Sequence, residues 1–197
     1  MSKFRNQLYN ITLIANVPSI IQNGILSHDL ASKIEHGSVA LEDVQDRREH
    51  KAVPNGLKLH SYANLYFNPR NAMMYRRRNQ APELCVLIVS ADVLDFEGAV
   101  VSDMNAAKDL VRFWEVRSGL GQLNFDEIYL SNWNVPDEHE KTRLKGCVCA
   151  EVLIPHKVEF SFIIGAYVVD DEARERLFGT GFPLPIGIKP DIFFRGE

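Results

Sequence analysis

The apolar residues of this chain gather in short runs that predict a sheet-rich fold. Residues 85–90 form a nearly unbroken apolar run, which is typical of a strand buried on both faces. An aromatic strand is expected to begin near Tyr62 and to end before Arg70. The other expected strands are a β-rich segment and two further apolar runs, at residues 8–14, 147–154 and 158–169.

Three segments have the features of helices. Asn16 can cap a short helix that carries Pro18 in its first turn and ends at Gly24. Apolar positions recur at helical spacing over residues 105–117, which predicts a second helix. Residues 170–177 predict a third, shorter helix.

Polar segments complete the picture. Residues 28–51 become highly charged towards their end and predict a mixture of helix and loop. Residues 136–145 are too charged for a core and predict an exposed loop directly before the strand that contains Glu151. A loop in this place either reads the substrate or only connects two elements. Together these elements predict one α+β domain over residues 1–197, with a mostly antiparallel β core and peripheral helices.

Composition and charge narrow the class of protein. The chain has 197 residues, of which 46% are hydrophobic and 24% charged, as in an ordinary globular domain. Its net charge of −4 argues against a broad electrostatic hold on nucleic acid, so any such contact needs a local basic patch. The polar first residues do not resemble a secretory signal, and no apolar stretch approaches the roughly 18 residues of a membrane span. We therefore expect a cytoplasmic protein that does not contact a membrane.

Cysteine usage and missing motifs exclude several kinds of site. Cys85, Cys147 and Cys149 form an odd set without metal-ligand spacing, which predicts reduced, buried thiols and no metal site. Alternation along a strand would put Cys147 and Cys149 on one face. The chain has no P-loop and no G-x-S-x-G motif, and Gly119-x-Gly121 lacks the third glycine of a dinucleotide fingerprint. Kinases, Rossmann dehydrogenases, zinc hydrolases and α/β-hydrolases are therefore excluded.

Two residues stand out for their chemistry. Glu151 places one carboxylate inside an otherwise apolar run, and a buried charge needs a partner or a pocket. Arg70 follows the aromatic strand, and an arginine together with a buried glutamate suits an anionic, sugar-containing ligand. The alternatives are a Glu151 side chain that faces solvent and an Arg70 side chain on a surface loop.

Basic and aromatic residues offer weaker signals for nucleic acid. Residues 76–78 are three consecutive arginines that could contact phosphates, although a solvated turn explains them equally well. Trp114 and Trp133 could stack on bases or could belong to the core.

Four ordered segments give the chain a resemblance to the DarT family of NAD-dependent DNA ADP-ribosyltransferase toxins. The segments are residues 9–24, 66–75, 102–107 and 150–155. The resemblance implies an ADP-ribosyltransferase-like domain that transfers ADP-ribose from NAD to a thymine or guanine base in single-stranded DNA and releases nicotinamide. It further implies NAD as co-substrate, no metal, and a macrodomain antitoxin, DarG, as the partner that removes the modification.

The resemblance also implies roles for individual residues. Arg70 and Glu151 match the catalytic arginine and glutamate of the family. Residues of about 45 to 72 would wrap NAD, and residues 103–145 would read the DNA strand. The residues implied to bind NAD, from the nicotinamide end along the cleft, are Asn10, Ile11, Thr12, Ser19 and Ser27, together with Arg70.

One departure from the family pattern keeps alternatives open. The family usually has histidine where this chain has Asn10, and often another where it has Leu13. Asparagine still donates and accepts hydrogen bonds, so NAD binding is retained in principle while the target base stays open. The alternatives are an NAD-dependent transferase that acts on RNA or protein, and an inactive module that binds NAD or nucleic acid. The presence of both Arg70 and Glu151 argues against an inactive module.

The implied chemistry agrees with these residue types. Breaking the nicotinamide–ribose bond develops positive charge on the ribose, which a carboxylate such as Glu151 can stabilise. A base nitrogen becomes a good nucleophile only when it loses its proton, so a nearby group must take the proton or stabilise the anion. The base must also leave any stack, which makes single strands the natural substrate.

Overall fold

A computed structural model of the chain describes residues 4–34, 42–54 and 56–195. Its strands are β1 (Gln7–Leu13), β2 (Ile25–Leu26), β3 (Tyr62–Tyr66), β4 (Leu84–Ser90), β5 (Val100–Ser102), β6 (Phe113–Glu115), β7 (Glu151–Pro155), β8 (Lys157–Val158), β9 (Ile163–Val168) and β10 (Ile186–Ile188). Its α-helices are α1 (Val17–Asn23), α2 (His28–Ala31), α3 (Glu42–Glu49), α4 (Ala72–Arg77), α5 (Val116–Gly119), α6 (Phe125–Ile128), α7 (Glu138–Cys147) and α8 (Asp171–Phe178).

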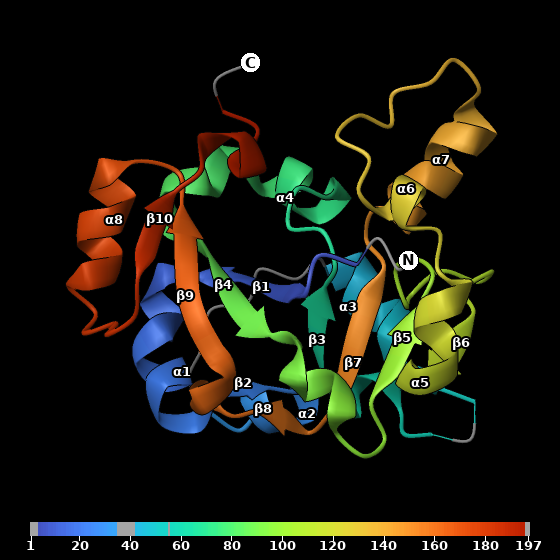
Figure 1. Cartoon of the computed structure of the whole chain (residues 1–197), viewed down its shortest axis with the longest axis horizontal. Helices are drawn as coiled ribbons and strands as arrows, with labels where there is room; N and C mark the ends of the chain where they lie inside the picture. Colours follow the sequence, from blue (N-terminus) through green and yellow to red (C-terminus); the bar gives the residue numbers. More distant parts are fainter. Residues whose placement is uncertain (1–3, 35–41, 55, 196–197) are drawn as a thin grey trace.

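One twisted sheet dominates the described part of the chain (Figure 1). Its eight described strands follow the order β10-β9-β4-β1-β3-β7-β5-β6, and only the β9–β10 pair is parallel. Strands β2 and β8 form a separate small antiparallel pair. The mostly antiparallel α+β architecture predicted from the sequence is therefore confirmed.

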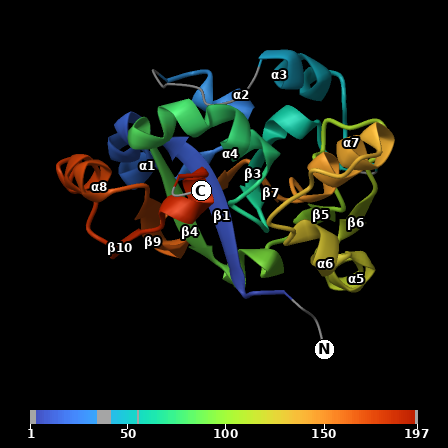
Figure 2. The same cartoon turned by 90° about the horizontal axis from the view of Figure 1, so that it is seen from above.

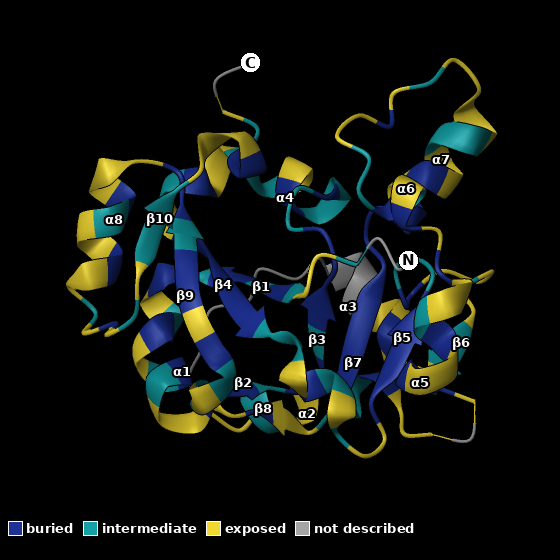
Figure 3. Cartoon of the chain, in the orientation of Figure 1, coloured by how far each residue is buried: buried dark blue, intermediate teal, exposed yellow. Residues whose placement is uncertain are grey.

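The core lies along the middle of this sheet (Figure 3). All residues of β4 except the last are buried, as the unbroken apolar run predicts. Helix α8 packs against β4 and β9 at one end of the sheet, while helices α5, α6 and α7 gather at the other end (Figure 1). Among the described residues, none of the helices has the length and apolar character needed to cross a lipid bilayer.

The sheet is nearly divided between β1 and β3. Strand β1 pairs with β4 over seven registered positions, whereas it pairs with β3 at one position, Tyr9–Tyr66. Next to this pair, the side chain of Asn10 spans the gap, and its Nδ2 donates to the backbone oxygen of Asn64 at 3.3 Å. We call this junction the seam. It joins two half-sheets, β10-β9-β4-β1 and β3-β7-β5-β6.

Local sequence signals place two helices correctly. Helix α1 follows Asn16 and ends before Gly24, whose φ of 79° lies in the left-handed region that glycine tolerates. The Asn16 side chain donates to Thr12 Oγ1 instead of capping the helix. Helix α8 begins after Asp170, whose Oδ1 accepts the backbone N–H of Ala173 at 2.8 Å.

The helix predicted over residues 105–117 is wrong. Residues 113–115 form strand β6, and Leu110 is 84% exposed instead of lying on a buried helical face. Two side chains stabilise turns that compete with the helix. The side chain of Asn105 accepts the N–H of Ala107 at 2.9 Å, and Asp103 accepts the N–H of Arg112 at 2.9 Å, which closes the connection between β5 and β6.

Two predictions before Glu151 are also corrected. Residues 138–147 form helix α7 instead of an exposed loop, because Asp137 caps the helix and charged pairs at i,i+3 spacing line its surface. Strand β7 begins only at Glu151, so Cys147 ends a helix and does not share a strand face with Cys149. All three cysteines are free and buried, as predicted. Helices α2 and α3 agree with the prediction for residues 28–51, of which residues 35–41 lie outside the described part.

Candidate active site

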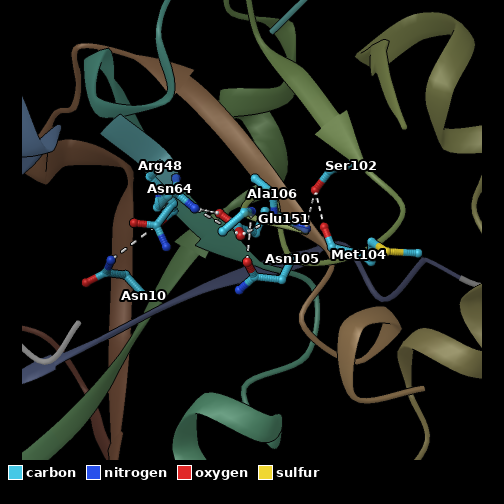
Figure 4. Close-up of polar contacts among 9 residues, drawn as sticks. Asn10, Arg48, Asn64, Ser102, Met104, Asn105, Ala106 and Glu151 are labelled. Carbon is cyan, nitrogen blue, oxygen red and sulfur yellow. Dashed lines mark hydrogen bonds and ion pairs between the residues drawn. The ribbon is translucent and has the colours of Figure 1, made fainter. Parts of the chain in front are cut away.

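Glu151, the first residue of β7, is completely buried and paired. Its exposed fraction is 0%, which excludes the alternative of a solvent-facing side chain. Arg48 Nη1 donates to both carboxylate oxygens, at 3.2 Å to Oε1 and 3.0 Å to Oε2 (Figure 4). The backbone N–H of Ala106 donates to Oε1 at 2.9 Å. The carboxylate is therefore fixed from two separate segments of the chain.

Helix α3 supplies the positive partner of Glu151. The Arg48 side chain is only 8% exposed, and its sequence position is 103 residues from Glu151. Lys51, just after the helix, donates from Nζ to the backbone oxygens of Ala107 at 3.0 Å and Lys108 at 2.6 Å. Helix α3 is therefore tied to the same turn that donates a hydrogen bond to Glu151.

Ser102 connects this turn to β7. Its buried hydroxyl accepts the backbone N–H of Glu151 at 3.1 Å and donates to the backbone oxygen of Met104 at 2.7 Å (Figure 4). These two hydrogen bonds fix the start of β7 against the turn that carries Ala106. The orientation of the Glu151 carboxylate is therefore set by the backbone as well as by Arg48.

A cavity of about 440 Å³, within the range of small-molecule sites, is lined by two neighbours of Glu151, its ion-pair partner Arg48 and its strand partner Tyr66. Glu151 itself is not among the described lining residues, so Arg48 and Tyr66 stand between its carboxylate and the cavity. Its walls come from both half-sheets, with Asn10 and Ile11 of β1 opposite Asn64 and Tyr66 of β3. The described lining residues include no aspartate or glutamate, and they include the cations Arg47, Arg48, Arg76, Lys108 and Lys145. A chain with a net charge of −4 therefore concentrates positive charge at one place, as an anionic ligand requires.

Two titratable side chains in the cavity wall stay neutral at ordinary pH. Burial, with a smaller contribution from the nearby Glu151, raises the pKa of Tyr66 well above its usual range. Burial also raises the pKa of Cys149 to about 11. Neither side chain therefore cancels the positive charge of the cavity.

The structure brings some of the implied NAD-binding residues to the cavity and leaves others aside. Asn10 and Ile11 line it. Thr12, Ser19 and Ser27 are not among its described lining residues. Thr12 Oγ1 accepts from Asn16, Ser19 Oγ accepts from Asn23, and the buried Ser27 Oγ has no hydrogen-bond partner among the described residues.

In the described contacts, Arg70 interacts with the C-terminal segment and not with Glu151. Its Nη1 donates to the backbone oxygen of Asp191, and its guanidinium carbon lies 3.9 Å from the ring centre of Phe194. Arg70 is also not among the described residues that line the cavity. The arginine that the structure places against Glu151 is Arg48.

Sequence reasoning missed Arg48 because a single arginine in a charged stretch carries no local signal, and its partner is distant along the chain. The turn that holds Ser102 and Ala106 lay within one of the segments of family resemblance, but its hydrogen bonds could not be foreseen. Trp133 is 7% exposed and also lines the cavity, so it belongs to both the core and the site. Within the described ranges, no three or more His, Cys, Asp and Glu side chains are grouped to bind a metal ion.

Comparisons with known proteins define the class of this site. The family model described as "ssDNA thymidine ADP-ribosyltransferase, DarT" matches residues 9–194. A DNA ADP-ribosyl transferase of Thermus sp. 2.9 is 31% identical over 201 residues, which cover 96% of this chain and 94% of that protein. A fusion of DNA ADP-ribosyl transferase and DNA ADP-ribosyl glycohydrolase from Thermosipho africanus is 30% identical, and the match covers 98% of this chain. This chain spans only about half (50%) of the length of that fusion protein.

Solved structures of the same two proteins share the fold. Thermus sp. 2.9 DarT in complex with ADP-ribosylated ssDNA has a TM-score of 0.82 and 25% identity, covering 95% of this chain and 96% of that chain. Thermosipho africanus DarTG in complex with ADP-ribose has a TM-score of 0.82 and 28% identity, covering 96% of this chain and 51% of that chain. The fold is that of an ADP-ribosyltransferase that acts on single-stranded DNA. The chain belongs to the DarT family of single-stranded DNA ADP-ribosyltransferases, as its four sequence segments indicated. Thermus sp. 2.9 DarT has also been solved in complex with NAD+.

Proposed function

We propose that this protein transfers ADP-ribose from NAD to a thymine base in single-stranded DNA and releases nicotinamide. The observation that carries the proposal is a buried Glu151 that is held by Arg48 and by the N–H of Ala106, while Arg48 also lines a cationic cavity in an otherwise acidic chain. The description of the family model supports thymidine as the acceptor, and the ADP-ribosylated ssDNA bound to the Thermus relative supports single-stranded DNA.

In this proposal Glu151 stabilises the reacting ribose. The bond between the nicotinamide nitrogen and ribose C1′ breaks, so positive charge develops on the sugar while nicotinamide leaves as a neutral molecule. A carboxylate in a site from which water is excluded stabilises that charge more strongly than it would in water, and it accepts a hydrogen bond from a ribose hydroxyl. A bond then forms between C1′ and a nitrogen of the base, and the proton of that nitrogen is released to the solvent, so the products are the ADP-ribosylated base, nicotinamide and one proton.

Arg48 is the arginine best placed to assist Glu151. Its guanidinium orients the carboxylate, lines the cavity and offers positive charge to NAD phosphates or to a base that loses its proton. The catalytic role that family resemblance gives to Arg70 stays a prediction, because the described contacts of Arg70 are with the C-terminal segment. Roles in NAD binding for Thr12, Ser19 and Ser27 also stay predictions.

Mass spectrometry tests the activity directly. Purified protein incubated with NAD and a mixed single-stranded oligonucleotide should give an adduct of one ADP-ribose. Glu151→Gln should reduce its formation by about 10²–10³-fold or more, because the variant removes the charge that stabilises the reacting sugar. The matched control is Glu172→Gln, since Glu172 is an exposed glutamate on α8 whose side chain is 86% exposed.

Other outcomes separate the alternatives. Sequencing the modified oligonucleotide identifies the base, and a guanine adduct would contradict the thymine assignment. An adduct on RNA or protein, with none on DNA, would favour a different acceptor. NAD binding without transfer to any acceptor would indicate the inactive module.

A toxin role in the cytoplasm, countered by a macrodomain antitoxin of the DarG type, completes the proposal. A transferase that modifies DNA bases would block copying of the strand and would need an enzyme that removes the modification. The fusion of transferase and glycohydrolase in the Thermosipho relative supports such a partner. Co-expression with a DNA ADP-ribosyl glycohydrolase should restore growth to cells that produce this chain, and unchanged growth would count against the pairing.

A further inference from the structure

A second cluster of side chains adjoins the cavity through Tyr75 and Trp133. It combines three aromatic rings with two arginines that cover ring faces, and we call it the aromatic ledge. Its members are Arg70, Tyr75, Arg78, Trp133 and Phe194.

The three rings of the ledge pack edge to face. Tyr75 and Phe194 have ring centres 5.1 Å apart, and Trp133 lies 5.8 Å from Phe194 and 6.2 Å from Tyr75. Arg70 lies 3.9 Å above Phe194, and Arg78 lies 4.2 Å above Tyr75. The ledge is therefore a preformed platform that carries positive charge and flat aromatic surface together.

The ledge is continuous with the cavity and open to solvent. Tyr75 and Trp133 line the cavity, while Tyr75 is 44% exposed, which is high for so large a ring. The C-terminal segment that carries Phe194 lies beside α4, which carries Tyr75, in both views of the fold (Figure 1, Figure 2). A ligand in the cavity therefore reaches both rings, and Tyr75 is the one that is also exposed to solvent.

The backbone of Phe194 indicates that this arrangement is specifically maintained. Its φ of 57° and ψ of 38° place a large aromatic residue in the left-handed region, which is unfavourable for residues other than glycine. The surroundings compensate, because its N–H donates to the backbone oxygen of Asp191 at 3.2 Å and its ring contacts Arg70 and the other two rings. Such backbone strain is concentrated at functional sites.

The chemistry of the ledge fits a nucleotide. Bases of any sequence stack on exposed aromatic rings, and arginines beside the rings bind the adjoining phosphates. Arg76 lines the cavity next to Tyr75, so positive charge continues from the cavity to the ledge. We propose that the ledge binds the nucleotide next to the target base in single-stranded DNA, with its base on Tyr75 and its phosphate at Arg76 and Arg78. The inference rests on the proposed function and assigns that site a second nucleotide position.

Steady-state kinetics with abasic oligonucleotides test this assignment. In the wild-type protein, an abasic site on one side of the target should lower kcat/KM for the oligonucleotide by about tenfold, the effect of losing one stacked base. Tyr75→Leu should lower kcat/KM by about the same factor on the intact oligonucleotide, and it should cause little further loss on the abasic one. Tyr75→Trp should retain most of the wild-type value, because it keeps an aromatic face.

Two controls separate binding from structure. Phe178→Leu removes another exposed ring, on α8 at 69% exposure, and should leave kcat/KM unchanged. Thermal melting of Tyr75→Leu should match the wild type within a few degrees. If the losses from Tyr75→Leu and from each abasic site simply multiply, the base does not stack on Tyr75 and the proposal is overturned.

Failure of the proposed function would look different. In that case no oligonucleotide, intact or abasic, would be modified by the wild-type protein, and the ledge assignment would be rejected with it. If the wild-type protein modifies intact DNA and abasic sites on either side of the target do not change kcat/KM, only the assignment of the ledge is rejected and the proposed function stands.

Discussion

Two arginine–carboxylate clusters in this protein differ in burial and in purpose. Arg48 and Glu151 are 8% and 0% exposed and meet at 3.0–3.2 Å. Arg143, at 41% exposure, binds Glu127 at 2.7 and 2.8 Å and Glu140 at 2.8 Å. The exposed cluster has the shorter hydrogen bonds and the lower desolvation cost, because its charges remain near water.

This difference indicates that the buried pair contributes more to activity than to the free energy of folding. Removing two charges from water is expensive, and a well-packed apolar pair is often as stable or more stable. The exposed cluster instead tethers α7 to α6 at little cost. We therefore expect changes at the buried pair to affect both activity and stability strongly, and changes at the exposed cluster to affect only stability, and weakly.

The largest expected effect comes from Arg48. Arg48→Met should abolish transfer and lower the free energy of unfolding by about 3–5 kcal/mol, because it leaves the Glu151 carboxylate buried without its partner. Chemical denaturation and the mass-spectrometric assay measure the two effects. Arg174→Met is the matched control, since Arg174 is a half-exposed arginine on α8.

A double variant and a second arginine sharpen this result. Arg48→Met combined with Glu151→Gln should recover much of the lost stability without recovering activity, because no unpaired charge remains buried. Arg70→Met should retain a larger fraction of activity than Arg48→Met. An inactive Arg70→Met beside an active Arg48→Met would return the catalytic role to Arg70.

Ser102 should have an intermediate effect. Ser102→Ala removes the acceptor of the Glu151 N–H and the link to Met104, so we expect kcat to fall about tenfold while KM for NAD changes little. Ser102→Thr keeps the hydroxyl and should restore most of kcat. Equal losses in Ser102→Ala and Ser102→Thr would show that volume at this position matters and the hydrogen bonds do not.

The smallest expected effect is at the exposed cluster. Glu127→Gln should lower the free energy of unfolding by no more than about 1 kcal/mol and leave activity intact. The Arg143 guanidinium lowers the pKa of Glu127 from its ordinary value of 4.5, so this contribution is present above about pH 4.5 and is lost as pH falls through the lowered pKa. Denaturation curves of wild type and variant should therefore converge in acid, and a stability difference that persists there would contradict the assignment.

The same comparison explains how far the sequence could predict the molecule. Glu151 was recognisable because a lone carboxylate in an apolar run is a local signal, and the ends of α1 and α8 follow from cap residues such as Gly24 and Asp170. Arg48 was not recognisable, because its function depends on a contact across 103 residues.

The errors in the predicted elements have a related cause. The charges of residues 136–145 predict a loop, although Asp137 and the ion pairs stabilise a helix over Glu138–Cys147. Residues 105–117 have helical spacing, but the side chains of Asp103 and Asn105 stabilise turns instead. In both places a few side-chain hydrogen bonds outweigh the average character of the segment.

The seam has a consequence for how such an enzyme diversifies. Each half-sheet keeps its own ladder, and the two meet at the single pair Tyr9–Tyr66. The side chain at position 10 crosses the gap without belonging to either ladder. Because Asn10 also lines the cavity, a substitution at position 10 can change the polarity of the cavity wall while the hydrogen-bonded ladder of each half-sheet stays intact.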